Sequence, residues 1–375
     1  MKRFTTAIFI IVLAAATIGA VWPQSGPPAY EERDFLTQIR RLTVEGRRAG
    51  EGYWSPDGKR MVFQSEREAD NPFYQIYVLD LATGDTKRIS PGFGKTTCAF
   101  FRPGSDEILF ASTHADPQSR KLQADEFAMR ASGGQRRYAW DFDPEMDIYA
   151  YSEKTGALKR LTTARGYDAE GAYSPDGAWI VFTSTRDAYN RALTDAEQKL
   201  LQKDAGHFGE IYIMRADGSS QRRLTHTPGY DGGPFFTHDG ARIVWRRFDS
   251  DGRAADIYTM KTDGSDVKRI TDFGSVSWAP YEHPSGQYII FASSKLGHDN
   301  FELFIVDTEG TKEPVRVTYS PGFDGLPVPS PDGKRLAWTS SRSGAGAGQI
   351  FVGEWNHEKA LEALRNAPAR RGTKK

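Results

Sequence analysis

Short segments in which apolar and polar residues alternate recur along almost the whole chain. A period of two is the pattern of strands that bury one face. The segments come in groups of four, and one clear group lies at 233–236, 242–245, 256–260 and 268–271. A four-stranded sheet of this size cannot bury both of its faces alone, so neighbouring sheets must cover one another. The pattern therefore predicts several small stacked sheets.

Each group carries the same phrase: an Arg-apolar-Thr/Ser strand, a Ser-Pro-Asp-Gly turn, an alternating strand and an Ile-Tyr-type strand. Proline presets φ for the second position of a tight turn, and glycine accepts the positive φ that such turns require. Three turns are clear and three are weaker, at 55–58, 174–177, 330–333, 102–104, 237–240 and 283–286. Six such units predict an all-β fold, a six-bladed β-propeller of four-stranded blades.

The two ends of the repeat region predict how the ring closes. The last Ile-type strand, at 349–352, has no Arg-apolar-Thr strand after it. An unmatched copy, Arg41-Leu42-Thr43, precedes the first turn. We therefore expect the N-terminal strand to complete the sixth blade, because closure protects the strand edges. An open array of six units is the alternative.

The N-terminus indicates export from the cytoplasm. Two basic residues are followed by an apolar run at 4–21 that ends in small residues, which is typical of a signal peptide cleaved near Ala20. An uncleaved anchor is the alternative, since about 18 apolar residues are borderline for spanning a membrane. The expected organisation is a signal peptide at 1–21, a linker at 22–37, the propeller at 38–356, and a short helix with a basic tail at 357–375. We expect a periplasmic or secreted protein without stable membrane insertion once the signal peptide is removed.

Composition excludes some classes of function. The chain has 49 basic and 49 acidic residues, so no overall charge points to a nucleic-acid partner. Its single cysteine, Cys98, excludes an internal disulfide and is expected to be a small buried hydrophobe.

The repeated Arg-Leu-Thr, Ser-Pro-Asp-Gly and Ile-Tyr phrases resemble the TolB-like, WD-like propeller repeat of bacterial envelope proteins. The resemblance covers about residues 38–356 and implies the propeller fold in the cell envelope. The segments 138–143, 229–235 and 322–327 look like TolB-like propellers that are fused to secreted zinc aminopeptidases. Because the chain ends shortly after the last strand, we expect no peptidase domain.

A Gly-aromatic-Asp phrase precedes the innermost strand of three predicted blades. It places Asp168, Asp231 and Asp324, with Glu170 as a further candidate, near the mouth of the axial channel. Clustered carboxylate oxygens suit Ca²⁺ or Mg²⁺. The sequence thus suggests a binding site or a metal site at this mouth. The alternative is that each aspartate accepts hydrogen bonds within its own loop.

Two insertions, at about 114–145 and 187–209, fall between the second and third strands of their blades. Long insertions on one face of a rigid scaffold commonly carry binding sites. The first contains a helical pattern at 121–130 followed by Tyr138, Trp140 and Phe142, and aromatic residues often anchor interfaces. The second contains a capping-box pattern beginning at Thr194. Packing of the aromatics onto the propeller rim is the alternative.

Motifs of common enzymes are missing from the sequence. It has neither a Gly-x-Ser-x-Gly nor a His-Glu-x-x-His pattern, and its seven histidines are scattered. We therefore predict a non-catalytic module that binds an envelope protein or peptide through the face carrying the insertions. A metal-dependent lyase or hydrolase at the channel mouth and a structural envelope scaffold are the alternatives.

Overall fold

The computed structural model describes residues 29–134, 142–344 and 347–370. The chain divides into two compact units, residues 1–30 and 31–375, and every described helix and strand lies in the second. The expected signal peptide at 1–21 lies outside the described residues. In the portion that is described, no helix is both long enough and apolar enough to cross a membrane.

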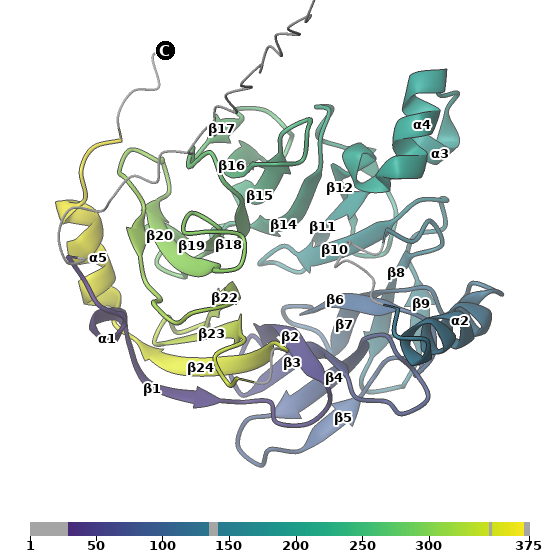
Figure 1. The fold of residues 1–375 in the computed structure, drawn as a ribbon, viewed down its shortest axis with the longest axis horizontal. Coiled ribbons are helices and arrows are strands. Elements are labelled where there is room, and N and C mark those ends of the chain that lie inside the picture. The colour runs from purple at the N-terminus through teal and green to yellow at the C-terminus, as the bar shows by residue number, and fades with distance from the viewer. Residues whose placement is uncertain (1–28, 135–141, 345–346, 371–375) are drawn as a thin grey trace, which may run out of the picture. The chain divides into compact units, whose positions relative to one another are not determined.

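Residues 31–375 form six four-stranded antiparallel sheets arranged as the blades of a propeller (Figure 1), so the predicted fold is confirmed. The blades are, in chain order, β2 (Arg48–Trp54), β3 (Arg60–Glu66), β4 (Gln75–Asp80) and β5 (Thr86–Arg88); β6 (Thr96–Phe101), β7 (Glu107–Ser112), β8 (Asp147–Ser152) and β9 (Leu158–Arg160); β10 (Asp168–Tyr173), β11 (Trp179–Ser184), β12 (Glu210–Arg215) and β13 (Arg222–Arg223); β14 (Asp231–Phe236), β15 (Arg242–Phe248), β16 (Ala255–Lys261) and β17 (Lys268–Arg269); β18 (Ser277–Glu282), β19 (Tyr288–Ser293), β20 (Glu302–Asp307) and β21 (Val315–Arg316); and β22 (Asp324–Pro329), β23 (Arg335–Ser340), β24 (Gln349–Trp355) and β1 (Leu36–Arg41).

The N-terminal strand closes the ring as predicted. In Figure 1 the purple strand β1 runs beside the yellow strand β24, and the two pair in antiparallel register. Beyond the strand, the Leu42 amide donates to the Ile350 carbonyl oxygen at 2.7 Å. The Thr43 hydroxyl donates to Gln349 Oε1 at 2.8 Å and accepts from the Ile350 amide at 2.9 Å. The two ends of the propeller are therefore joined by backbone and side-chain hydrogen bonds.

The Arg-apolar-Thr phrase fastens the outermost strand of a blade to the third strand. In the fourth blade the Thr271 hydroxyl donates to Asp256 Oδ1 at 2.9 Å and accepts from the Ile257 amide at 2.9 Å. The Arg269 guanidinium binds the other oxygen of Asp256. Three other blades repeat this arrangement, with the threonine–acid pairs Thr162–Asp147, Thr225–Glu210 and Thr318–Glu302. The repeat in the sequence is thus a repeated hydrogen-bond network.

The Ser-Pro-Asp-Gly phrase forms the turn between the first and second strands. In the third blade the Ser174 hydroxyl donates to Asp176 Oδ1 at 2.5 Å and accepts from the Trp179 amide at 2.9 Å. Asp176 also accepts from the Ala178 amide at 3.0 Å, and Gly177 has a φ of 68°. The side chains therefore satisfy the turn amides while glycine provides the left-handed conformation.

The insertions contain helices, as predicted. The helices are α1 (Glu32–Phe35), α2 (Ser119–Ala131), α3 (Asp187–Asn190), α4 (Asp195–Lys203), the 3-10 helix η1 (Ala205–Phe208) and α5 (His357–Asn366). Thr194 caps α4 with the predicted capping box. Ser112 at the end of β7 pairs with the first residue of β6 and the first residue of β8. The insertions of both blades consequently lie at the end of the ring where the innermost strands begin, on neighbouring blades (Figure 1).

Candidate functional site

Every innermost strand contains a β-bulge at the same position. The register shifts once in each of the six pairings between first and second strands. At each bulge one residue has a left-handed backbone with φ between 50° and 59°: Glu51, Cys98, Glu170, Gly233, Ala279 and Leu326. Five of these are not glycine, although this conformation costs an L-residue about 1 to 2 kcal/mol. Bulges redirect side chains and are frequent beside functional sites.

The six bulge residues surround a small cavity where the innermost strands converge, which places it on the propeller axis. Its volume is about 30 Å³, and its walls include Tyr53, Phe235, Tyr281 and Trp278. The rings of Phe235 and Tyr281 lie 4.9 Å apart, and those of Tyr53 and Phe235 lie 5.6 Å apart. Tyr53, Phe235 and Tyr281 each lie two residues after the bulge residue of their own strand. The aromatic layer is therefore on the far side of the bulge residues from the end that carries the insertions.

One side of this cavity holds a buried ion pair. Arg246, in β15, donates from Nη2 to Glu170 Oε1 at 2.8 Å and to the Tyr230 hydroxyl at 2.9 Å. Oε2 of Glu170 accepts from the Tyr230 hydroxyl, the Gly233 amide and the Thr183 hydroxyl at 2.6 to 2.8 Å. Burial alone would raise the pKa of Glu170, but the charge of Arg246 and these donors hold it below its ordinary value. Glu170 is therefore ionised and fully engaged.

Glu51, in β2, lies on the same cavity in a different environment. It is partly exposed, so the cavity communicates with solvent. The thiol of Cys98 donates to Glu51 Oε2 at 3.4 Å. The neighbouring Thr97 hydroxyl donates to Gln64 Oε1 at 2.8 Å. Burial, followed by the charge of Glu170, raises the pKa of Glu51 to about 7. This carboxyl group thus changes its charge near neutral pH.

Cys98 is buried, as expected, and it lines the cavity beside Glu51. Burial, and then the charge of Glu51, raises the pKa of the thiol. A raised pKa keeps the thiol protonated, so Cys98 is a weak hydrogen-bond donor at this site and not a nucleophile.

We expect Glu51→Gln to be more stable than the wild-type protein above neutral pH. The pKa of Glu51 is raised from 4.5 to about 7 in the folded state, so its stabilising contribution is complete below pH 4.5 and is lost as the pH rises through 7. Urea unfolding should give similar free energies for both proteins near pH 4.5. At pH 8.5 the variant should be more stable by about 2 to 3 kcal/mol. Equal free energies of unfolding at both pH values would contradict the raised pKa.

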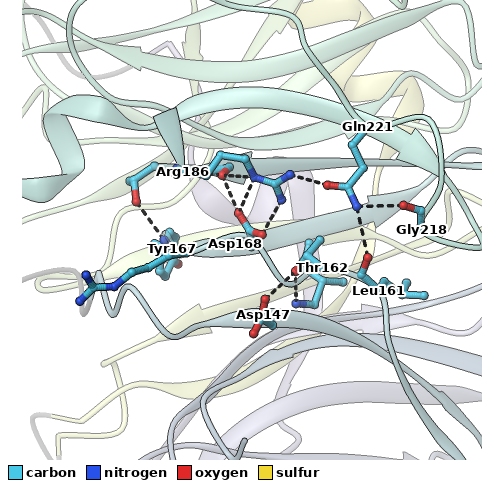
Figure 2. A network of polar contacts seen from close by, with 12 residues as sticks. Asp147, Leu161, Thr162, Tyr167, Asp168, Arg186, Gly218 and Gln221 are labelled. Atoms are coloured by element: carbon cyan, nitrogen blue, oxygen red, sulfur yellow. Dashed lines mark hydrogen bonds and ion pairs between the residues drawn. The ribbon is translucent and has the colours of Figure 1, made fainter. Parts of the chain in front are cut away.

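The three predicted aspartates are each bound within their own blade. Asp168 is buried and accepts from the Arg186 guanidinium at 2.5 Å and from the Ser184 hydroxyl at 2.5 Å; Figure 2 shows this pair extended to Gln221. Asp231 forms two bonds of 2.7 Å with Arg247. Asp324 binds Arg342 at 2.8 Å. Each aspartate is thus neutralised by an arginine near the end of the second strand of its blade.

Burial raises the pKa of Asp168 to about 6, because its effect outweighs the opposing effect of the Arg186 charge. Burial also raises the pKa of Asp324. Among the described residues no group of three or more His, Cys, Asp or Glu side chains is placed to hold a metal ion. The shared Ca²⁺ or Mg²⁺ at Asp168, Asp231 and Asp324 stays a prediction. Of the four predicted channel carboxylates, Glu170 is the one that lines the axial cavity.

Of the insertion aromatics, Tyr138 and Trp140 lie outside the described residues. Phe142 packs edge-to-face on Tyr167 and Tyr230, with ring centroids 5.0 and 5.3 Å apart. Because Tyr230 also binds Glu170, the end of the first insertion rests on the residues beside the axial cavity.

Sequence reasoning missed that Glu51, Cys98 and Arg246 share a cavity. The first two, with Glu170, stand at the bulge position, which an alignment of the six repeats would have placed together. Arg246 lies in a second strand, and no spacing in the sequence relates it to the bulge of the preceding blade.

Comparisons with known proteins support the fold. No protein-family model matches the chain. An uncharacterized peptidase, YuxL of Bacillus subtilis, is 25% identical over 244 residues, which is 57% of this chain and 34% of that protein. An uncharacterized protein of Agrobacterium fabrum, Atu1656, is 29% identical over 219 residues, which is 53% of this chain and 65% of that protein. The chain therefore spans about a third of the first relative and under two thirds of the second.

Solved structures with the same fold include TolB-type propellers. A TolB candidate from Agrobacterium tumefaciens superposes with a TM-score of 0.56 at 21% identity, over 85% of this chain and 97% of that one. TolB from Acinetobacter baumannii gives 0.53 at 17% identity, over 82% and 63%. An oligogalacturonate lyase from Vibrio parahaemolyticus gives 0.52 at 12% identity, over 86% and 94%. At these identities the likeness establishes a TolB-like six-bladed propeller and leaves the chemistry open.

Proposed function

We propose that this protein is a non-catalytic binding module of the bacterial envelope, periplasmic or secreted, which holds a protein or peptide on the face carrying the two insertions. The observation that carries the proposal is α4. None of its nine residues is buried, so the helix adds no side chain to the core of the propeller. It is nevertheless held in place by its capping box and by the ion pairs of Arg191 with Asp187 and Glu197. A well-formed helix without a core function is best explained as a contact surface.

The first insertion also supports the proposal that this face binds a partner. Gln123 in α2 donates to the Asp70 carbonyl oxygen at 2.9 Å and accepts from the Gly94 amide at 2.8 Å. Arg130 binds Glu66 Oε1 at 2.6 Å and the Pro72 carbonyl oxygen at 2.9 Å. These contacts fix α2 on the ring while Phe127 keeps 39% of its surface exposed. A fixed helix with an exposed aromatic residue is suited to a protein partner.

An enzyme at the axial cavity is the second candidate. It is favoured by the opposite pKa shifts of Glu51 and Glu170, since such a pair separates an acid from a base. The cavity volume of about 30 Å³ argues against it. A water needs at least about 10 to 15 Å³ by this measure, so the site has room for about two waters and is too small for a sugar ring.

Site-specific photo-cross-linking tests the binding face. We expect a photoreactive residue at Phe127 to form a specific adduct with an envelope protein or peptide of the host. Val267 provides the matched control, because it is 48% exposed and lies between a third and a fourth strand, at the opposite end of the ring. The adduct at 127 should also disappear when 188–208 are replaced by a short Gly-Ser linker.

Equal adducts at 127 and 267, or an unchanged adduct after removal of 188–208, would contradict the proposed face. Thermal unfolding of each variant should remain cooperative at a similar temperature, which separates lost binding from lost folding.

A further inference from the structure

The axial cavity has an asymmetric ring of side chains that the insertion-face function does not use. Around the ring, Glu51, Cys98 and Glu170 come from three consecutive blades, and Ala279 and Leu326 make the opposite wall apolar. The sixth position is Gly233, where a Cβ atom would approach Arg246 Nη1 to 2.0 Å. A Cβ atom there would displace the guanidinium from its position beside the ring. The polar half is therefore a built arrangement of side chains from distant parts of the chain.

The charges of this cavity favour a cation. The charged lining consists of two carboxylates and one guanidinium, so its net charge is negative when both carboxylates are ionised and zero when Glu51 is protonated. Glu170 and Arg246 neutralise each other through their 2.8 Å contact, and the remaining lone pairs of Glu170 accept from three further donors. Among the described residues, Glu51 faces no cation except this engaged arginine. A carboxylate held in a largely enclosed cavity without its own counter-ion is an incomplete pair.

The volume limits what the cation can be. About 30 Å³ admits about two water-sized groups. An ammonium head is of that size. A divalent ion would need six or more oxygen ligands, whereas the ring provides two carboxylates, one of them fully engaged. The rings of Tyr53, Phe235, Tyr281 and Trp278 supply apolar and π surfaces that suit an alkylammonium group better than a hydrated metal ion.

We propose that the axial cavity binds the ammonium group of a primary amine, with Glu51 as its counter-ion. The inference does not depend on the proposed insertion-face function. Binding is non-covalent: the protonated amine forms an ion pair with the Glu51 carboxylate, and where Glu51 carried a proton, that proton passes to solvent. A free small amine and the amine of a peptide present the same group, so both sources are tested.

Of the titratable groups around Glu51, none has a pKa shifted toward neutral pH, so Glu51 is the group that titrates there. These surrounding groups are Glu170, Arg246, Cys98, Tyr53 and Tyr167. Burial raises the pKa of the thiol and of both phenols, the pKa of Glu170 lies below its ordinary value, and arginine stays charged. The proton released on amine binding can therefore be assigned to Glu51.

Isothermal titration calorimetry with n-butylamine hydrochloride tests the proposal. We expect one site per chain and, at pH 6.5, proton release, measured by repeating the titration in buffers of different ionisation enthalpy. Proton release should nearly vanish at pH 8.5, where Glu51 is already ionised and the amine is still protonated. Glu51→Gln should weaken binding at least tenfold. The amide resembles the protonated carboxyl group in shape and charge, so this variant is expected to fold.

Glu45→Gln is the matched control, because it removes a carboxylate that is 75% exposed and bound to Arg67, and it should bind n-butylamine like the wild-type protein. Tetramethylammonium, which is too large for the cavity, should not bind. Equal binding by the wild-type protein and Glu51→Gln, no binding by the wild-type protein, or displacement of the amine by equimolar KCl would each overturn the proposal.

Replacing butylamine by Nα-acetyl-lysine amide distinguishes the two sources of the amine. Tighter binding of the lysine derivative points to a peptide amine, and tighter binding of butylamine points to a small free amine.

Discussion

Replacing Arg246 with methionine is expected to lower the free energy of unfolding by about 3 to 5 kcal/mol. Arg246 is 3% exposed and Glu170 is 9% exposed, so the change leaves an ionised carboxyl group buried without its guanidinium partner. Methionine retains much of the arginine stem, so the loss reports on charge and not on packing. Urea unfolding monitored by tryptophan fluorescence measures the effect.

The double variant Arg246→Met/Glu170→Gln should recover most of that loss, because removal of both charges removes the desolvated carboxylate. Arg60→Met is the matched control. It breaks a half-exposed pair with Glu153 at 2.8 Å, and exposed pairs contribute about 1 kcal/mol or less. If the double variant were as unstable as Arg246→Met, the buried-charge explanation would be wrong.

Removal of the closing strand is expected to produce the second large effect. A chain that starts at Val44 lacks β1, the hydrogen bonds of Thr43 to β24, and the buried residues Phe35 and Leu36. Phe35 and Leu36 are 0% and 2% exposed, and each contributes about 1.5 to 3 kcal/mol by burial. The edge of β24 also becomes available for pairing with other chains.

We expect the shortened chain to lose at least about 10 °C in Tm, or to aggregate before unfolding. A chain that starts at Glu31 keeps all of these contacts and is the control. Differential scanning calorimetry with size-exclusion chromatography measures both properties. A shortened chain that stays monomeric with an unchanged Tm would show that the ring does not depend on closure by β1.

The repeated phrases could be read from the sequence because each is a local interaction. The hydrogen bonds of the Ser174–Asp176 turn lie within six residues, and those of the Thr194 cap lie within four, so each structural unit is contained in a short stretch of sequence. The unmatched Arg41-Leu42-Thr43 could also be placed, because the last blade lacked one copy of the repeat. Phrases that repeat thus predicted the blades, the turns, the closure and the insertion helices.

The sequence predicted only part of the candidate site. The Gly-aromatic-Asp phrases identified the start of three innermost strands, but Asp168, Asp231 and Asp324 are bound to Arg186, Arg247 and Arg342 in the structure. Glu170, two residues after Asp168, is the predicted residue that reaches the axial cavity. A bulge adds one residue to a strand and redirects the side chains beyond it, and a pattern with a period of two does not show where this happens.

The sequence by itself determined the architecture: six four-stranded units, their turns, the N-terminal closing strand and the face that carries the insertions. Only the tertiary structure decided the chemistry of the axis. It placed Glu51, Cys98 and Glu170 around one cavity and set Arg246 against Glu170 across a blade boundary. The physical reason is that the repeats are held by contacts between near neighbours in the chain, whereas the cavity is formed by residues from Glu51 to Val328 that meet only when the ring is closed.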